Sequence, residues 1–186
     1  ILMNDIDLGT HDQWIELGSG HYDHLFPGEK VAYFYKKTFF VNNRLIHGEL
    51  TCQTKGCGIF GLVHTSRLDR IFSAVNLYFD GDYISKHPDD EYSSSVGHIA
   101  GTLYSSIISN STVVGSVQEN IIQPREAETE RWLYVGGIAG YARNSILENN
   151  EFAGLIRGTA YIPTDVGGML GGVAVSAKSV NTIDHC

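Results

Sequence analysis

Two segments of the chain repeat each other. Val96–Val117 reads VGHIAGTLYSSIISNSTVVGSV, and Val135–Ile156 reads VGGIAGYARNSILENNEFAGLI. Nine of the 22 aligned positions are identical, without a gap. A third copy opens with VGGMLGG at Val166 and loses register after Ser176, and a more degenerate fourth opens with CGIFGLV at Cys57 and continues to Gly81. Such repetition is typical of folds in which small units stack on one another.

Each unit contains two short runs in which apolar residues and glycines alternate with other residues. In the first copy these runs are Ile99–Leu103 and Val113–Val117, and the second copy repeats the pattern. Alternation with a period of two is typical of a strand with one buried face. The Ser- and Asn-rich segments between the runs, SSIISNS and NSILENN, favour a turn. One unit is therefore predicted to be strand, turn, strand, and to bury its apolar face only by stacking into a right-handed parallel β-helix, or β-solenoid.

The glycines of the repeats resemble a phosphate-binding loop only superficially. VGGIAG lacks the lysine of such loops, and no helical segment follows it. We interpret these glycines instead as positions where the missing Cβ lets the backbone bend or approach a neighbouring coil. SNS at Ser109–Ser111 and ENN at Glu148–Asn150 suit the corners, because Asn tolerates the left-handed conformation and can bind free backbone groups.

The cores GIFG, HIAG, GIAG and GMLG, which begin at residues 58, 98, 137 and 168, resemble the Gly–hydrophobic–hydrophobic–Gly core of the GLUG-repeat proteins. The Ser-Ile-x-x-Asn pattern that follows two of them is also similar. At the N-terminus, LMNDIDLG (Leu2–Gly9) and WIELGS (Trp14–Ser19) are similar to the lead-in of that family, and Phe39–Thr51 is similar to a degraded form of its next segment. The resemblance implies a β-solenoid from a secreted or surface-anchored bacterial protein, such as an adhesin or a region accompanying an immunoglobulin A-type peptidase. In that family the repeats act as stalk or binding modules, without catalytic residues of their own.

We expect residues 1–186 to form a single domain that is part of a longer polypeptide. Residues 1–56 would form lead-in coils, and the repeats would occupy 57–81, 96–117, 135–156 and 166–186. The segments Asp82–Ser94, Gln118–Tyr134 and Gly158–Asp165 lie between repeats and contain three of the four prolines. Insertions at one point of every repeat project from one side of a solenoid, which is often its binding side.

Trp132 and Tyr134 are the candidate ligand-binding residues. They directly follow the charged run PREAETER, and such aromatic side chains can stack on a sugar or dock a partner. Packing of this loop against the coils is the alternative, and it is the favoured interpretation.

Carboxylates gather at Asp80, Asp82 and Asp89–Glu91. A carbohydrate-active β-helix enzyme, either a lyase or a hydrolase, could use such acids, whereas a solvated loop is the favoured interpretation. The cluster of His11, His21, Asp23 and His24 is likewise interpreted as a polar loop in preference to a metal site. HExxH and GxSxG are absent, so we predict no catalytic residue, no metal and no cofactor.

The formal net charge of −8 argues against nucleic acid or an anionic membrane surface as a partner. No apolar run is long enough to span a membrane, so membrane insertion is not expected. Cys52 and Cys57 bracket QTKG, a loop compatible with a disulfide and equally with two free thiols. We therefore expect a non-catalytic extracellular or cell-surface module acting in adhesion, binding or scaffolding, with a host or matrix protein or a glycan as its partner. The carbohydrate-active enzyme is the alternative.

Overall fold

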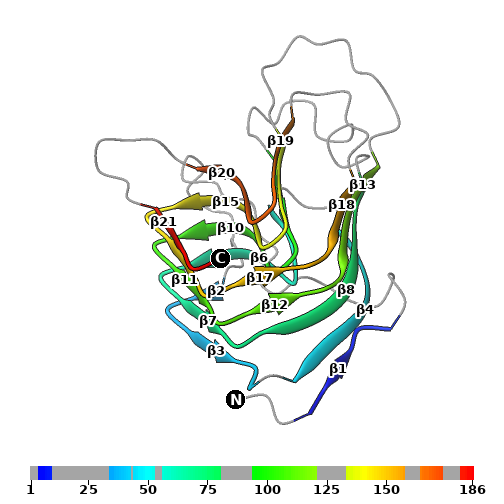
Figure 1. The fold of residues 1–186 in the computed structure, drawn as a ribbon, viewed down its shortest axis with the longest axis horizontal. Helices are drawn as coiled ribbons and strands as arrows, with labels where there is room; N and C mark the ends of the chain where they lie inside the picture. Colours follow the sequence, from blue (N-terminus) through cyan, green and yellow to red (C-terminus); the bar gives the residue numbers. More distant parts are fainter. Residues whose placement is uncertain are drawn as a thin grey trace, which may run out of the picture.

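The computed structural model describes residues 4–9, 34–42, 44–52, 56–80, 94–120, 133–157, 164–173 and 181–186. Within these ranges the regular secondary structure consists of strands, and every strand pair is parallel (Figure 1). The described part of the chain has no helix with the length and apolar character that a membrane crossing requires. The prediction of an all-β fold with parallel sheets is confirmed.

The strands form four sheets, which we name A to D. Sheet A contains β1 (Ile6–Asp7), β4 (Leu45–Cys52), β8 (Phe72–Asp80), β12 (Thr112–Val113), β13 (Ser116–Asn120), β17 (Glu151–Phe152) and β18 (Leu155–Arg157). Sheet B contains β2 (Phe34–Tyr35), β6 (Phe60–His64), β10 (Ala100–Tyr104), β15 (Ala139–Arg143) and β20 (Leu170–Val173). Sheet C contains β3 (Thr38–Phe40), β7 (Arg67–Asp69), β11 (Ile107–Ser109), β16 (Ile146–Glu148) and β21 (Thr182–Asp184). Sheet D contains β5 (Gly56–Cys57), β9 (Ser94–Gly97), β14 (Leu133–Gly136) and β19 (Thr164–Gly167).

The chain visits the sheets in the order D, B, C, A and then begins again one strand further along the stack. We call each circuit a coil. In Figure 1 the strands of sheet C, from β3 through β7 and β11 to β21, lie above one another on the left, and β4, β8, β13 and β18 of sheet A lie on the right. This topology is compatible with a β-solenoid, because strands far apart in sequence become hydrogen-bonded neighbours in successive coils.

Strand register confirms the alignment of the repeats. Val96 pairs with Val135, and Ile107 pairs with Ile146, as the ungapped alignment requires. The degenerate copy pairs Cys57 with Val96 but Phe60 with Ala100, so its turn is one residue shorter. In the last coil, Val173 pairs with Ala142 and Thr182 with Ile146, which leaves five more residues in this segment than in the coil before. This extra length is the reason for the lost register.

The prediction of strand, turn, strand is wrong in two respects. The second run, Val113–Val117, is not one strand, because β12 ends at Val113 and β13 begins at Ser116. The Ser/Asn-rich segment is not a single turn, because it contains a three-residue strand of sheet C between two corners. Ser105 and Asn110 form these corners in one coil, with φ of +47° and +52°, and Asn144 and Asn149 form them in the next, both at +52°. A strand of three residues is too short to show the alternation on which a prediction depends.

Side-chain hydrogen bonds join the corners of successive coils. The backbone N–H of Ser66 donates to Ser106 Oγ at 3.1 Å, and the N–H of Ser106 donates in turn to Ser145 Oγ at 3.2 Å. At the next corner the N–H of Ser111 donates to Asn150 Oδ1 at 3.0 Å. These contacts confirm that Ser and Asn occupy the corners and bind backbone groups there.

Apolar side chains from all four sheets fill the interior of the coils. Leu77 of sheet A, Leu103 of sheet B, Ile108 of sheet C and Val96 of sheet D are completely buried. At the junction of sheets D and B the contact is between backbones. A Cβ at Gly140 would meet the backbone of Ser95 and Val96 in sheet D. This supports our interpretation that the glycines serve close approach between segments of backbone.

The insertions attach along one line of the stack. Each connects a strand of sheet A to a strand of sheet D: Asn120 pairs with Asp80 where they leave, and Leu133 pairs with Ser94 and Thr164 where they return. The bounds differ from the prediction, because β13 extends to Asn120 and β14 begins at Leu133. Residues 121–132 therefore form the second insertion, in place of 118–134, and its course lies outside the described residues, as does that of the other insertions.

Candidate functional site

The structure describes only some of the predicted site residues. Tyr134 is the second residue of β14 and belongs to sheet D, not to a loop, whereas Trp132 lies outside the described residues. Asp80 is the last residue of β8, and its backbone pairs with Asn120. Asp82, Asp89–Glu91 and the cluster of His11, His21, Asp23 and His24 lie outside the described residues.

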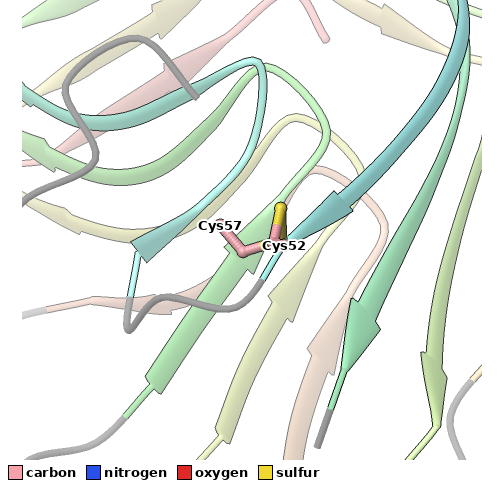
Figure 2. The surroundings of a disulfide bond; sticks show 2 residues. All are labelled: Cys52 and Cys57. Atoms are coloured by element: carbon pink, nitrogen blue, oxygen red, sulfur yellow. A yellow bond between two sulfur atoms is a disulfide. The ribbon is translucent and has the colours of Figure 1, made fainter. Parts of the chain in front are cut away.

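Cys52 and Cys57 form a disulfide (Figure 2). Cys52 ends β4 of sheet A, Cys57 ends β5 of sheet D, and both are fully buried. The bond therefore closes the return from sheet A to sheet D in the coil where only residues 53–55 separate the two strands. Cys186 is a free, exposed thiol.

Five side chains with binding chemistry gather on the outer surface of sheets B and D. We call them the aromatic patch: His64, Tyr104, Tyr134, Tyr141 and Arg143. Alternation along β10 and β15 buries Leu103 and Ala142 and leaves the residues on either side of them partly or fully exposed. The stacking of the coils then aligns residues from different repeats.

Three members of the aromatic patch form a column along the stack. His64, Tyr104 and Arg143 end β6, β10 and β15 and pair in register. The His64 and Tyr104 rings are stacked, with centroids 6.1 Å apart and planes 13° apart. The Arg143 guanidinium carbon lies 5.7 Å from the Tyr104 centroid. Because His64 and Arg143 belong to the coils before and after Tyr104, they lie on opposite faces of its ring.

The other two members lie beside this column. The rings of Tyr134 and Tyr141 are tilted by 40°, with centroids 5.2 Å apart. Burial raises the pKa of Tyr141, and the nearby phenols of Tyr104 and Tyr134 raise it further, while Arg143 acts in the opposite direction. Tyr141 therefore stays protonated at neutral pH and presents a hydroxyl that can donate a hydrogen bond.

Sheet C carries a second polar group of residues, but its members bind one another. Asp69 Oδ1 accepts hydrogen bonds from Ser109 Oγ and Asn110 Nδ2, both at 2.7 Å, and Arg67 lies 3.8 Å away. Burial opposes ionisation of Asp69, but the hydrogen bonds and the cations outweigh it, so its pKa is lowered. We regard this group as a structural network. Among the described ranges, no three His, Cys, Asp or Glu side chains gather as metal ligands.

A serine–histidine pair lies inside the coils. Ser73 Oγ and His98 Nε2 are 2.7 Å apart, and both residues have no exposed surface. His98 Nδ1 has no hydrogen-bond partner, and burial lowers the pKa of His98 to about 3. Because no substrate can reach this pair, it does not form a nucleophilic site.

The comparisons with known proteins found no matching family model, no matching curated protein and no matching solved structure. Of the aromatic patch, sequence reasoning identified only Tyr134. The alignment of the repeats already placed Tyr104 and Arg143 at equivalent positions, and a search of the aligned outward positions would have found this column.

Proposed function

We propose that the chain is a non-catalytic binding or scaffolding module of an extracellular or cell-surface protein, built as a right-handed solenoid of GLUG-type repeats. The observation that carries this proposal is the aromatic patch. It joins residues of three successive coils on an outer surface, next to the strand by which the insertion 121–132 returns to sheet D. A surface assembled from several coils suits recognition of an extended partner.

The disulfide supports an extracellular location. Structural disulfides form and persist in oxidising compartments, and Cys52–Cys57 is buried within the core. A glycan or a host or matrix protein is the partner that we expect there.

A carbohydrate-active enzyme with acids in the 80–91 region is the alternative function. Within the described part of the chain, Asp69 accepts hydrogen bonds from Ser109 and Asn110, and the Ser73–His98 pair is buried. No observation on the described residues favours catalysis over binding.

The test combines binding and turnover. The labelled protein is applied to arrays of glycans and matrix proteins, and the same ligands are assayed for new reducing ends and for unsaturated products. Binding without turnover, weakened when Tyr134 is changed to Ala, is the expected result. Turnover that disappears in an Asp82→Asn or Asp89→Asn variant would contradict the proposal and favour the enzyme.

A further inference from the structure

We propose that the side-chain amide nitrogen of Asn110 is an acceptor site for an N-linked sugar. Asn110-Ser111-Thr112 has the Asn-x-Ser/Thr pattern that this modification requires, and no other asparagine of the chain is followed two positions later by Ser or Thr. The inference rests on the proposed function for its extracellular location, because proteins that carry such sugars are typically exported or displayed at the cell surface.

Asn110 lies on the surface, at the corner between β11 of sheet C and β12 of sheet A. Asn110 is exposed, whereas Ser111 beside it is buried. Arg70, Asn149 and His185 form the same corner in other coils, with positive φ values like that of Asn110, and all three are exposed. The surface along this corner is therefore polar, and a sugar attached to Asn110 would remain in water.

The hydrogen bonds of the Asn110 amide are compatible with a sugar on its nitrogen. Nδ2 donates to Asp69 Oδ1 at 2.7 Å, and Oδ1 accepts from Asn149 Nδ2 at 3.4 Å. A primary amide has two N–H groups, and attachment of a sugar consumes one of them. The second N–H can still donate to Asp69, and the carbonyl oxygen is unchanged.

The transfer requires a sugar diphosphate as donor. The amide nitrogen forms a bond to the anomeric carbon of the sugar and loses one proton. The bond from that carbon to the diphosphate oxygen breaks, and the diphosphate leaves with the electron pair. The diphosphate is linked to a lipid or to a nucleoside, and a glycosyltransferase of the cell catalyses the step. Both kinds of donor produce the same bond at Asn110.

The position of Asn110 separates the sugar from the surfaces that are candidates for ligand binding. Sheet C lies between this corner and the column of the aromatic patch on sheet B, because β11 connects the two. Sheet A lies between the corner and the insertions, which attach where the chain passes from sheet A to sheet D. A sugar on Asn110 would therefore leave both surfaces accessible to a partner.

The test measures the occupancy of Asn110 by mass spectrometry of the peptide that contains it. One sample is the full chain secreted from yeast, which supplies a lipid-linked donor. The other is the full chain produced in bacteria together with an asparagine glycosyltransferase that uses UDP-glucose. We expect most molecules to carry a sugar on Asn110 in at least one sample. Modification in only one of the two supports the inference and identifies the kind of donor.

Two variants assign the modification to the sequence pattern and to the corner. Thr112→Val should abolish it, because valine resembles threonine in shape but has no hydroxyl. Glu151→Thr is the matched variant that creates a site. It places threonine two positions after Asn149, which is exposed at the same corner of the next coil and also has φ of +52°. Asn149 should be unmodified in the wild type and modified in this variant. Circular dichroism and thermal melting verify that each variant is folded.

The outcomes separate this inference from the proposed function. An unmodified Asn110 in both samples, or a sugar that persists on Asn110 in Thr112→Val, would overturn the inference. Modified and unmodified chains are also applied to the arrays of glycans and matrix proteins. An unmodified Asn110 in both samples with binding on the arrays would overturn the inference and leave the proposed function intact. A sugar on Asn110 with no binding by either form of the chain would support the inference and contradict the proposed function.

Discussion

At the scale of single residues, two successive coils fill equivalent parts of the interior with side chains of different size. In one coil His98 extends to Ser73, a small residue of the coil before. In the next coil the aligned residue is Gly137, where a Cβ would lie 2.5 Å from the Phe152 ring. Phe152 and Ser73 occupy equivalent positions in sheet A, because each pairs with Val113 of the coil between them. The large His98 thus faces the small Ser73, whereas Gly137 faces the large Phe152. Because the large and small residues change places, both coils are filled to a similar density.

His98 makes the stability depend on pH. It is neutral and buried in the folded chain, with a pKa of about 3, whereas an unfolded chain has an ordinary value of 6.5. Protons therefore bind the unfolded state preferentially below pH 6.5, and the fold loses about 1.4 kcal/mol per pH unit from there down to about pH 3. Urea titrations of the wild type and of His98→Gln between pH 7 and 4 measure this difference.

The Gln variant keeps an amide that can bind Ser73 but has no proton to gain. Its free energy of unfolding should therefore fall less steeply with decreasing pH than that of the wild type. The carboxylates, Asp69 included, contribute equally to both proteins and cancel in the difference. Parallel pH profiles for the two proteins would refute the role of His98.

The repeat glycines are not equivalent. A Cβ at Gly140 would overlap the backbone of sheet D, whereas one at Gly168 has nothing within 4 Å. Gly140→Ala should therefore lower the free energy of unfolding by about 2 kcal/mol or more, and Gly168→Ala should change it by less than about 0.5 kcal/mol. Chemical denaturation of both variants measures this, and similar losses at the two positions would contradict the packing argument.

At the scale of elements, the five-residue strands of the aligned repeats could be predicted from sequence, and the strands of three residues could not. Val96–Val117 shows its strands of sheets B and A by alternation, and its corners by Ser and Asn. The strand of sheet C in the same segment, Ile107–Ser109, is invisible because three residues show no period. Sheet D was missed as well, since β14 occupies the end of what looked like an insertion.

The disulfide joins two elements that would otherwise be connected only by residues 53–55. Changing both Cys52 and Cys57 to Ala should lower the free energy of unfolding by about 2 kcal/mol, because the unfolded chain gains freedom and the folded chain loses packing. Urea unfolding with and without reductant measures this effect.

Reductant should shift the unfolding midpoint of the wild type and leave that of the double variant unchanged. Cys186→Ala is the control, since this exposed thiol should contribute little in either condition. A wild-type midpoint that does not respond to reductant would show that the bond contributes nothing to stability.

At the scale of the whole molecule, the stacked coils determine which residues meet. His64, Tyr104 and Arg143 are 40 and 39 positions apart, and they become neighbours only because the coils share one register. Sequence alone predicted the repeat and the parallel strands. The alignment of His64, Tyr104 and Arg143 in one column follows from these two predictions. It could not predict that Tyr134 approaches Tyr141, because that contact depends on the corner between sheets D and B.

The insertions should be replaceable without loss of the fold. Cys52 and Glu119 both pair with Phe79, so they occupy equivalent positions at the end of sheet A. Gly56 and Tyr134 both pair with Ser95, so they occupy equivalent positions at the start of sheet D. When residues 120–132 are replaced with Gln-Thr, these two residues and Leu133 form a three-residue connection between Glu119 and Tyr134. This connection has the same length as residues 53–55 between Cys52 and Gly56. The variant should unfold cooperatively within about 1 kcal/mol of the wild type, since shortening a loop has a small entropic effect.

A single Gly inserted after Asn110 is the matched control. This insertion falls at a corner between sheets C and A, where it would shift the register of β12 and turn buried side chains outward. We expect that variant to lose its cooperative transition in urea. Equal disruption by the loop replacement would show that the returns from sheet A to sheet D are not independent of the coils.

The alignment of these returns also has an evolutionary consequence. In the described coils, the chain passes from sheet A to sheet D at equivalent positions, and the strands between two such passages are held by hydrogen bonds to neighbouring coils. A mutation that lengthens, shortens or exchanges the segment at one passage therefore leaves the rest of that circuit in place. Such a molecule can acquire new surfaces one circuit at a time, at little risk to its folding.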